Sequence, residues 1–347
     1  MIFWTAAFAL LVVLLWLLHD ILLPFVAGMV LAYLLDPLAN RFERLGVSRF
    51  LATLVIISLF ILIFVLIIIL VAPVLVSQLL AFIDKLPGYL ARLQELATDS
   101  NRPWLNKLVG ENLGSAEIGN MMKQSAGGLT VFLHSLWSGG RSVISIFSLI
   151  VVMPVVAFYL INDWPRIVAT IDNWLPRKQA DIIRSLIREI DRAIAGFVRG
   201  QTGVAFILGS FYAIGFTFAG LSFGLLIGLF AGLLSFVPYA GSLTAFIISV
   251  GVAVAQFWPE WTPVLIIVGI NAVGQILEGS VLSPYFVGPS VGLHPVWLMF
   301  ALFAFSYLFG IVGLLVAIPL SAAGGVLVRF AIKKYLASSV YTGEERR

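Results

Sequence analysis

The sequence predicts an all-α, polytopic integral membrane protein with about eight transmembrane segments. Hydrophobic residues make up 61% of the 347-residue chain, and charged residues only 11%. A soluble domain is about half apolar and about a quarter charged, so this excess is too large for a single buried core. The apolar residues also form runs that approach the ~20 residues of a membrane-spanning helix. We therefore expect a lipid bilayer around most of the chain.

The first part of the chain predicts three membrane helices and then a region outside the bilayer. Apolar runs cover residues 2–18, 21–35 and 51–76, and we assign these helices to residues 1–79. The first run is longer than the apolar part of a secretory signal peptide and has no basic residue before it. Residues 80–141 are less apolar and contain prolines and glycines, which predicts short helices on the extracytoplasmic side.

A fourth membrane helix is predicted over residues 142–162, and a polar segment over residues 163–200 follows it. Apolar residues recur in the polar segment at helical spacing, while arginines repeat every four residues on another face. The arginines are Arg184, Arg188 and Arg192. This pattern predicts an amphipathic helix on the cytoplasmic side, which is either solvated or lies on an anionic membrane surface.

The basic residues predict the orientation, because short loops rich in Lys and Arg stay on the cytoplasmic side of a membrane. The rule places loop 36–50, segment 163–200 and the residues from Arg329 onward inside. The N-terminus and the C-terminus are then both cytoplasmic, and residues 333–347 form a cytoplasmic tail.

Residues 201–332 form a predicted C-terminal transmembrane core that contains no Lys or Arg before Arg329. Several of its apolar runs are short for a membrane span, and the chain breaks at 238–241 and 310–313. Non-helical backbone at membrane depth is tolerated where it lines a cavity or is buried in protein. We therefore expect at least one broken or re-entrant helical hairpin here. The residues that would break or hinge these helices are Pro238, Gly241, Gly310, Gly313 and Pro319.

Glycines repeat at every fourth position in one part of this core. They are Gly220, Gly224, Gly228 and Gly232. The spacing puts all four on one helix face and lets another backbone approach closely. Tight helix packing is the simpler interpretation, and a sliding or hinge surface for a moving element is the other.

Glu278 is the residue that points most strongly to function. It ends the stretch Asn271-Ala-Val-Gly-Gln275-Ile-Leu-Glu278, whose polar residues share one helix face. A carboxylate that faced lipid would be costly, so this face should line a pathway or meet a partner. Since the core offers no cation before Arg329, a buried Glu278 could take up and release a proton or bind a cation. The alternative is a Glu278 near a helix end that the loop at Ser283-Pro284 solvates.

Other polar residues of the core give weaker indications. Gln201 enters the core as an uncharged side chain that could line the same path. Glu260 lies between Trp258-Pro259 and Trp261, and paired Trp residues are typical of a membrane interface, so we expect it to be solvated. His294-Pro295 opens the last apolar block and predicts the start of a helix.

The sequence predicts no catalytic centre, no cofactor and no metal site. The absence of Cys excludes disulfides, thiolate ligands and Cys nucleophiles. Residues 220–224 match the Gly-x-Ser-x-Gly pattern of hydrolases, but that pattern has meaning only at a strand-to-helix turn with Asp and His partners. Neither H-E-x-x-H nor a Walker A sequence occurs, so a zinc protease or an ATP motor is not indicated. The net charge of +4 is modest, and we expect no nucleic-acid partner.

Several short motifs follow one another in an order that is typical of one family. They are Asp36-Pro-Leu38, Phe158-Tyr-Leu-Ile-Asn-Asp163, Phe197-Val-Arg-Gly-Gln201, Phe236-Val-Pro-Tyr-Ala-Gly241, Gln275-Ile-Leu-Glu278, Leu282-Ser-Pro284, Gly288, Gly292-Leu-His-Pro295, Gly310-Ile-Val-Gly313 and Ala317-Ile-Pro-Leu320. With these motifs the chain resembles the autoinducer-2 exporter (AI-2E) family of bacterial membrane proteins. Glu278 matches the acidic position of the family's Gln-x-x-Glu motif, and Pro238 and Gly241 match its helix break.

The resemblance implies an eight-span protein of the bacterial inner membrane that forms a homo-oligomer, with a pentamer as one candidate. Some members of the family are linked to export of autoinducer-2, a small polar signal of quorum sensing. Others are linked to sodium–proton antiport. The resemblance thus implies transport and leaves the substrate open.

Together the sequence predicts a secondary transporter or channel-like exporter of a small polar solute, with autoinducer-2 as one candidate. Glu278 would couple transport to a proton or a cation, and Gln275, Asn271 and Gln201 would line the pathway. One alternative is a Na⁺(Li⁺)/H⁺ antiporter that uses the same Glu278. Another is a membrane scaffold that moves no solute and depends on its extracytoplasmic region.

Overall fold

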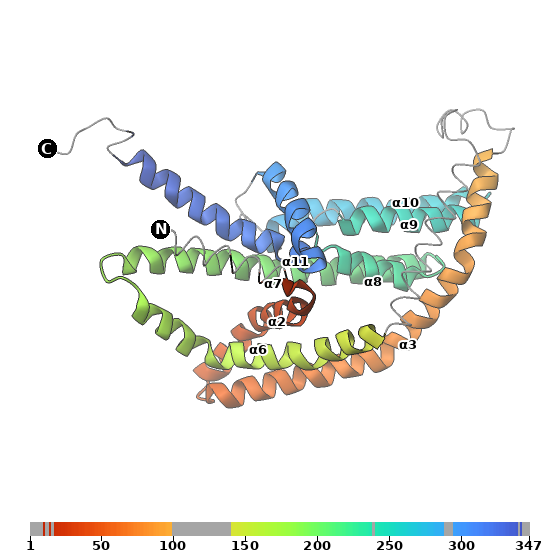
Figure 1. Ribbon diagram of the computed structural model, residues 1–347. Helices are drawn as coiled ribbons and strands as arrows, with labels where there is room; N and C mark the ends of the chain where they lie inside the picture. The colour runs from red at the N-terminus through yellow and green to blue at the C-terminus, as the bar shows by residue number, and fades with distance from the viewer. Residues whose placement is uncertain are drawn as a thin grey trace. The chain divides into compact units, whose positions relative to one another are not determined.

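The computed structural model describes residues 10, 14, 17–98, 140–237, 240–287, 294–338 and 341. Within these ranges the chain forms helices and turns but no strand, which confirms the predicted all-α class. Figure 1 shows the helices in chain order. They are α2 (His19–Arg44), α3 (Arg49–Thr98), α6 (Gly140–Trp174), α7 (Ala180–Phe218), α8 (Gly224–Leu234), α9 (Ala240–Phe257), α10 (Trp261–Ile276), the π-helical segment η1 (Leu277–Val287) and α11 (Pro295–Leu336).

Six helical stretches in the described ranges are long and apolar enough to cross a membrane, and shorter apolar helices accompany them. The long stretches are Ile21–Arg44, Arg49–Tyr89, Ile150–Trp174, Ala180–Phe218, Trp261–Phe286 and Val312–Leu336. The shorter helices are Gly224–Leu234, Gly241–Phe257 and Val296–Gly310. A helix needs about 20 residues to cross the hydrocarbon layer, and α8 has 11. The chain is therefore a polytopic helical membrane protein whose C-terminal half contains helices shorter than a span.

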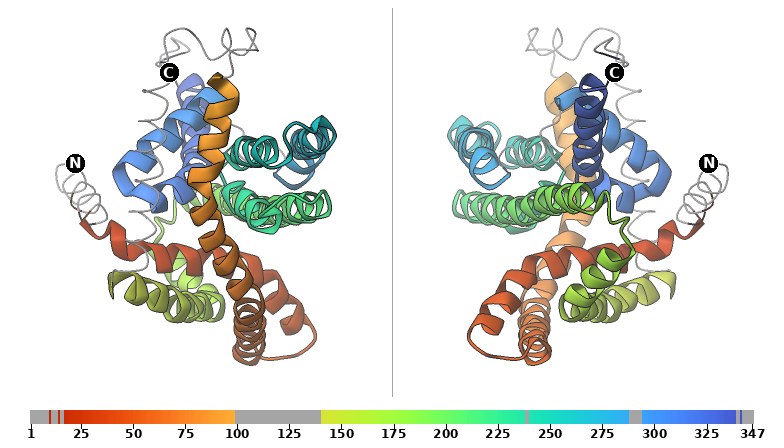
Figure 2. Two further views of the ribbon diagram at one scale, coloured as in Figure 1. Left: turned by 90° about the vertical axis from the view of Figure 1, so that its right-hand side faces the viewer. Right: turned by 90° about the vertical axis from the view of Figure 1, so that its left-hand side faces the viewer.

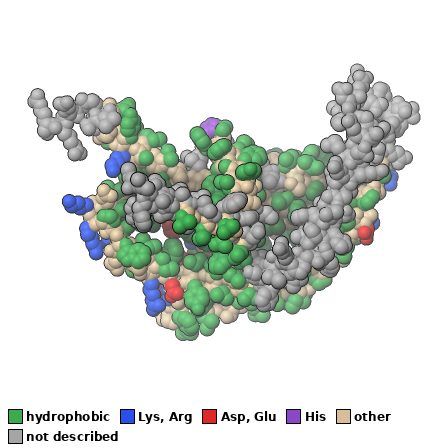
Figure 3. All heavy atoms as spheres, viewed as in Figure 1, with side chains coloured by type: hydrophobic (Ala, Val, Ile, Leu, Met, Phe, Trp, Pro, Cys, Tyr) green, Lys and Arg blue, Asp and Glu red, His purple; other side chains and the backbone are tan. Residues whose placement is uncertain are grey.

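The described surface is strongly apolar, as expected of a protein that lies in lipid. Figure 3 shows hydrophobic side chains over much of the described surface in view. On α3 the side chains of Leu62, Leu66 and Ile69 are 66%, 54% and 63% exposed. Large apolar side chains on successive turns would be unfavourable in water but match the acyl chains of a bilayer.

Predicted segment boundaries at 79/80, 162/163 and 200/201 fall inside continuous helices of the structure. α3 passes through the first, α6 through the second and α7 through the third. The amphipathic arginine segment and the start of the C-terminal core thus belong to one helix. Residues 99–139, most of the predicted extracytoplasmic region, lie outside the described residues, and its position stays a prediction.

The chain divides into two compact units. Unit 1 contains residues 1–62, 147–203 and 282–347, and unit 2 contains residues 63–146 and 204–281. α3, α6, α7 and η1 contribute residues to both units, because the divisions fall inside these helices.

The core of unit 1 joins α2 to the first part of α3 and to α6, which lie side by side in Figures 1 and 2. Its buried residues are Leu31, Ala32, Ala39, Ile56, Ile57, Ala157 and Ile161. Gly28 lets α2 approach α6, because a Cβ at this position would lie 2.8 Å from the carbonyl oxygen of Met153. Small residues at helix crossings are the usual means of close packing in membranes.

Arg49 connects the same three helices through polar contacts. Its Nη2 donates to Asp36 Oδ1 at 2.9 Å, and its Nε donates to the Ile161 carbonyl oxygen at 2.8 Å. Its Nη1 donates to Asn40 Oδ1 and Glu43 Oε2, both at 3.0 Å. Only a planar guanidinium offers donors in this fork arrangement, so lysine could not replace it.

In unit 2 the glycine repeat packs α8 against the second part of α7. A Cβ at Gly224 would lie 2.8 Å from the Phe216 carbonyl carbon, and Cβ atoms at Gly228 and Gly232 would meet the backbone of Ala213 and Gly209. Gly220 departs from the expectation, since it precedes α8 and adopts a φ of 74° in the α7–α8 turn. Only three of the four glycines therefore lie on one helix face.

The α7–α8 turn is closed by Gln256 of α9. Its Oε1 accepts from the Ser222 backbone N–H at 2.8 Å, and its Nε2 donates to the Gly220 carbonyl oxygen at 2.9 Å. Phe223, at a φ of 62°, completes the turn, and its ring packs against Phe82 of α3. The Gly-x-Ser-x-Gly match thus lies between two helices and not at a strand-to-helix turn.

α11 of unit 1 starts where predicted and is broken at a glycine. His294 is the N-cap, with Nδ1 accepting from the Val296 N–H, and Pro295 is the first residue of the helix. Gly310, at φ 58° and ψ −136°, kinks the helix, as Figure 1 shows. This backbone conformation is essentially restricted to glycine. Gly313 makes room for the turn before the kink, where a Cβ would meet the Phe305 carbonyl group.

Candidate functional site

Glu278 is buried in unit 2, at the junction of α10 and the π-helical segment. Its side chain is 7% exposed, and a side-chain hydrogen bond joins it to Ser242 near the start of α9. Its Oε2 is buried and has no hydrogen-bond partner among the residues that the structure describes. π-helical insertions occur often at functional sites. The alternative in which a loop solvates Glu278 is therefore wrong, because the side chain packs inside the unit.

Asn271 of α10, two turns before Glu278, is a second buried polar residue of the site. Its Nδ2 donates to Ser249 Oγ at 2.9 Å and to the Ile267 carbonyl oxygen at 2.8 Å. A carbonyl oxygen can only accept, so the Ile267 contact fixes which end of the amide faces it. Asn271 Oδ1 is then left buried, and no described residue bonds to it.

The two polar contacts lie in register along the antiparallel pair of α9 and α10. Ser242 and Ser249 are seven residues apart on α9, and Asn271 and Glu278 are seven residues apart across α10 and η1. Both intervals are two helical turns, so the contacts form two rungs about 10 Å apart. We call these four residues the polar ladder. All four are buried, and each rung contains one oxygen that lacks a hydrogen-bond partner within the described ranges.

A cavity of about 450 Å³ opens beside the polar ladder between α9 and α10. Polar lining comes from Ser242, Asn271 and Gln275, and the other walls are apolar. The apolar lining residues are Leu243, Phe246, Val268 and Ala272. Apolar walls with a few convergent polar groups are typical of small-molecule sites.

Tyr212 of α7 packs against α10 at Gly274, one turn before Glu278. A Cβ at Gly274 would lie 2.5 Å from the Tyr212 Cζ, so the glycine makes room for the ring. Tyr212 is 1% exposed, stacks on Phe216 with ring centroids 5.4 Å apart, and lies within electrostatic range of Glu278. The carboxyl therefore lies among helices, with one polar wall towards α9 and an aromatic wall towards α7.

The atoms of the polar ladder that could bind a cation are the carboxylate oxygens of Glu278, the serine hydroxyls and the amide oxygen of Asn271. Among the described residues no group of three or more His, Cys, Asp or Glu could hold a metal ion. Residues 200–328 also contain no Lys or Arg that could neutralise Glu278 from within this part of the chain. One carboxylate with hydroxyl and amide oxygens matches the charge of a proton or a hard monovalent cation.

The structure brings some predicted site residues together. Asn271 and Gln275 both line the cavity, while Glu278 is buried one rung away. Gln201 is buried in unit 1, to which the polar ladder does not belong. Glu260 is exposed at the start of α10.

The predicted helix breaks also have defined surroundings. Gly241 lies where α9 begins against α8, and a Cβ there would lie 2.5 Å from the Ala231 carbonyl oxygen. Pro319 lies inside α11, and Pro238 falls outside the described residues.

Ser242, Ser249 and Tyr212 are site residues that sequence reasoning missed. The serines recur with the same seven-residue period as Asn271 and Glu278, which was the available signal. A serine in an apolar helix usually bonds a backbone carbonyl of its own helix, as Ser235 and Ser321 do. Their facing partners become evident only when α9 and α10 are placed side by side.

Comparison with known proteins identifies the family. A family model described as "AI-2E family transporter" matches residues 5–333. The chain is 28% identical to "Putative transport protein YrrI" of Bacillus subtilis over 315 residues, which are 89% of this chain and 86% of that protein. It is 28% identical to "Putative permease PerM" of Escherichia coli K12 over 314 residues, which are 87% and 84% of the two chains. The chain therefore belongs to the AI-2E family of membrane transporters.

Proposed function

We propose that this transporter moves a small polar solute as a secondary transporter or channel-like exporter, with Glu278 binding the proton or cation that is coupled to it. Membership in a transporter family and the membrane-spanning helices support the general role. Autoinducer-2 is the candidate solute, because some members of the AI-2E family, to which the chain belongs, are linked to its export. The polar ladder and its cavity are the proposed pathway.

The observation that carries this proposal is a pair of buried oxygens, Glu278 Oε2 and Asn271 Oδ1, to which no residue in the described part of the chain donates a hydrogen bond. A buried polar group without a hydrogen bond costs about 1–3 kcal/mol, and a charged group costs more. Ionisable residues inside membrane segments usually mark ion or proton pathways. A proton or a bound cation would satisfy the carboxyl. The unpartnered oxygen therefore favours binding of a proton or a cation, which the transporter could release again on the other side of the membrane.

A cation–proton antiporter is the second candidate, and the composition of the polar ladder favours it. The only acid of the ladder is Glu278, and the other groups are neutral oxygens of serine and asparagine. Such a site could hold either H⁺ or Na⁺ at one carboxylate and could not hold both at once. Competition for one carboxylate is the basis of exchange, so no organic solute would be required.

We place the protein in the bacterial inner membrane with both termini in the cytoplasm, and we expect a homo-oligomer. The orientation rests on basic residues of α2, α7 and α11 and on the rule that short basic loops stay inside.

Flux measurements on purified protein in proteoliposomes test these functions. Vesicles loaded with autoinducer-2 would receive an imposed pH gradient, and solute efflux would be measured. A second assay would record internal pH after a Na⁺ jump without organic solute. Glu278→Gln keeps the size of the side chain and removes its charge, so we expect coupled flux to fall to the level of empty vesicles. Glu260→Gln is the matched control, because it makes the same change at an exposed position.

Each outcome separates the candidates. Gradient-dependent efflux that is lost only in Glu278→Gln supports the coupled exporter, and Na⁺-driven pH change without solute supports the antiporter. Efflux at a rate that does not depend on the pH gradient would indicate a channel and would contradict a coupling role for Glu278. Equal rates for wild type and Glu278→Gln in both assays would contradict the role of Glu278. Wild-type flux no higher than that of empty vesicles in both assays would favour the membrane scaffold.

A further inference from the structure

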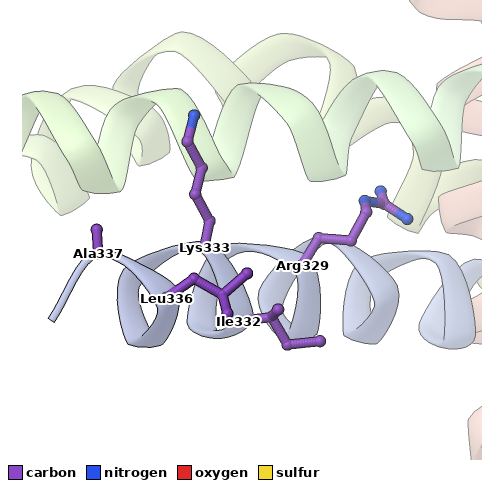
Figure 4. Close-up of a pocket in the computed structure, with 5 residues that line it drawn as sticks. All are labelled: Arg329, Ile332, Lys333, Leu336 and Ala337. Atoms are coloured by element: carbon purple, nitrogen blue, oxygen red, sulfur yellow. The ribbon is translucent and has the colours of Figure 1, made fainter. Parts of the chain in front are cut away.

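The C-terminal turns of α11 carry a second groove, which is remote in sequence from the polar ladder. Its volume is about 440 Å³, and its lining residues are Arg329, Ile332, Lys333, Leu336 and Ala337. Figure 4 shows Arg329 and Lys333 extending from α11 towards the neighbouring helix, whereas Ile332 and Leu336 lie close against α11 itself. The groove thus combines cationic side-chain ends with an apolar floor.

The neighbouring helix is the first part of α7, which belongs to the same unit as α11. Arg329 Nη2 lies 3.5 Å from Glu189 Oε1, and both side chains are about half exposed. Arg188 and Arg192 of α7 are exposed on either side of Glu189 in the sequence. The amphipathic arginine segment therefore runs beside the groove.

Positive charge exceeds negative charge around the groove. Arg329, Lys333 and Lys334 follow one another on α11, and Glu189 is the acid that pairs with Arg329. Within the described part of the chain Lys333 and Lys334 form no ion pair. An anion in the groove could therefore bind Lys333 without displacing an acidic partner from it.

The position of the groove on α11 indicates where its ligand lies. Val312–Leu336 is a candidate membrane span, and the groove occupies the last turns of that span. The end of a span lies at the level of the lipid headgroups, where Lys and Arg reach the aqueous side and their neighbours stay among acyl chains. Ile332 and Leu336, 52% and 46% exposed, would then contact lipid tails.

We propose that this groove binds the phosphate group of an anionic phospholipid, with Arg329 and Lys333 as the principal ligands. Basic pockets between helices at the membrane surface bind acidic headgroups, and the apolar floor provides the complementary surface for an acyl chain. The same bound lipid would lie beside the arginines of α7. The site is independent of the proposed transport function and would exist in either candidate transporter.

Binding is tested on the full-length protein in mixed micelles with phosphatidylglycerol or phosphatidylcholine. We expect phosphatidylglycerol to raise the melting temperature of the wild type and phosphatidylcholine to leave it unchanged. Loss of both cations in the double variant Arg329→Gln/Lys333→Gln should lower the affinity for phosphatidylglycerol about 30-fold. Native mass spectrometry would count the lipids that remain bound.

Two matched variants keep the result interpretable. Arg41→Gln/Arg44→Gln removes the same charge from exposed residues at the end of α2, and it should bind phosphatidylglycerol like the wild type. Arg329→Lys/Lys333→Arg keeps the charge and should retain binding within a few-fold. Equal stabilisation of wild type and the Gln double variant would overturn the proposal. Stabilisation by inorganic phosphate alone, at the same concentration, would replace the lipid with a free phosphate.

Discussion

At the scale of single residues, Ser242 is the hydrogen-bonding partner that connects Glu278 to α9. Ser242→Ala removes this contact and changes little else in volume. A hydrogen bond to a charged group contributes about 1.5–3 kcal/mol, so we expect coupled flux to fall at least roughly tenfold. Initial rates in proteoliposomes at one fixed pH gradient would measure the loss.

Ser321→Ala is the matched control for this change. The Ser321 hydroxyl donates to the Ala317 carbonyl oxygen within α11, so its loss should leave the transport rate unchanged. Equal rates in both variants would show that Ser242 does not act on the pathway.

Gly310 gives a second prediction for a single residue. Its φ of 58° and ψ of −136° are strained for any other amino acid, so Gly310→Ala should lower stability by about 1–3 kcal/mol. Gly324→Ala in the same helix is the control, because a Cβ there meets no atom within 4 Å. The melting temperature in detergent should fall for the first variant and stay constant or rise for the second. An unchanged melting temperature for Gly310→Ala would show that this strained backbone conformation is not required, and it would contradict a fixed kink at Gly310.

At the scale of helices, the close contact of α7 and α8 depends on glycine. Gly228→Ala would place a Cβ against the Ala213 backbone, which cannot yield as a flexible side chain would. Overpacking of this kind costs about 1–3 kcal/mol. We expect a smaller monodisperse fraction in size-exclusion chromatography, whereas Gly251→Ala, a position with open space, should match the wild type. Normal behaviour of Gly228→Ala would mean that α8 can move away from α7.

Arg49 gives a prediction for the three helices of the unit 1 core. Lysine cannot reproduce donors to Asp36, Asn40 and the Ile161 carbonyl oxygen at once. Arg49→Lys should therefore destabilise the protein by about 1–3 kcal/mol, since it leaves part-buried acceptors without their donors. Arg44→Lys makes the same change at an exposed residue and should have no measurable effect on thermal unfolding. A similar melting temperature for both variants would contradict a stabilising role for Arg49.

Sequence reasoning located most helices but not the limits of all of them. The start of α11 at Pro295 and the breaks near Gly241 and Gly310 could be predicted, because Pro and Gly act through their own backbone geometry. The π-helical segment after Ile276 could not, since its pattern of apolar residues resembles that of an α-helix. Gly220 was assigned to the wrong element because spacing alone does not reveal a turn.

At the scale of the whole molecule, the orientation in the membrane can be tested by introducing single cysteines. No native cysteine has to be removed first, since the chain contains no Cys. Lys178→Cys, between α6 and α7, would introduce the only thiol. We expect an impermeant maleimide to label it only after the cells are permeabilised, because basic connections stay inside. Ser338→Cys, after α11, should behave in the same way. Labelling of either residue in intact cells would reverse the proposed orientation.

The residues of the polar ladder differ in how far the sequence alone could identify them. Glu278, Asn271 and Gln275 could be identified from one helix, because a carboxylate in an apolar segment needs an explanation. Their partners Ser242 and Ser249 depend on how two helices align, and this information is spread over both. Gln201 matched the same polarity rule but belongs to a different unit.

The two rungs of the polar ladder are separated by two helical turns on each helix, a distance of about 10 Å. Where α9 and α10 stand along the membrane normal, a cation that steps between rungs crosses about a third of the ~30 Å hydrocarbon layer. It would then also cross about a third of the membrane voltage. A full crossing at 100 mV changes the energy of one charge by about 2.3 kcal/mol, so the step changes by about 0.8 kcal/mol. Turnover would then respond about fourfold to each 100 mV, even when every concentration is held constant.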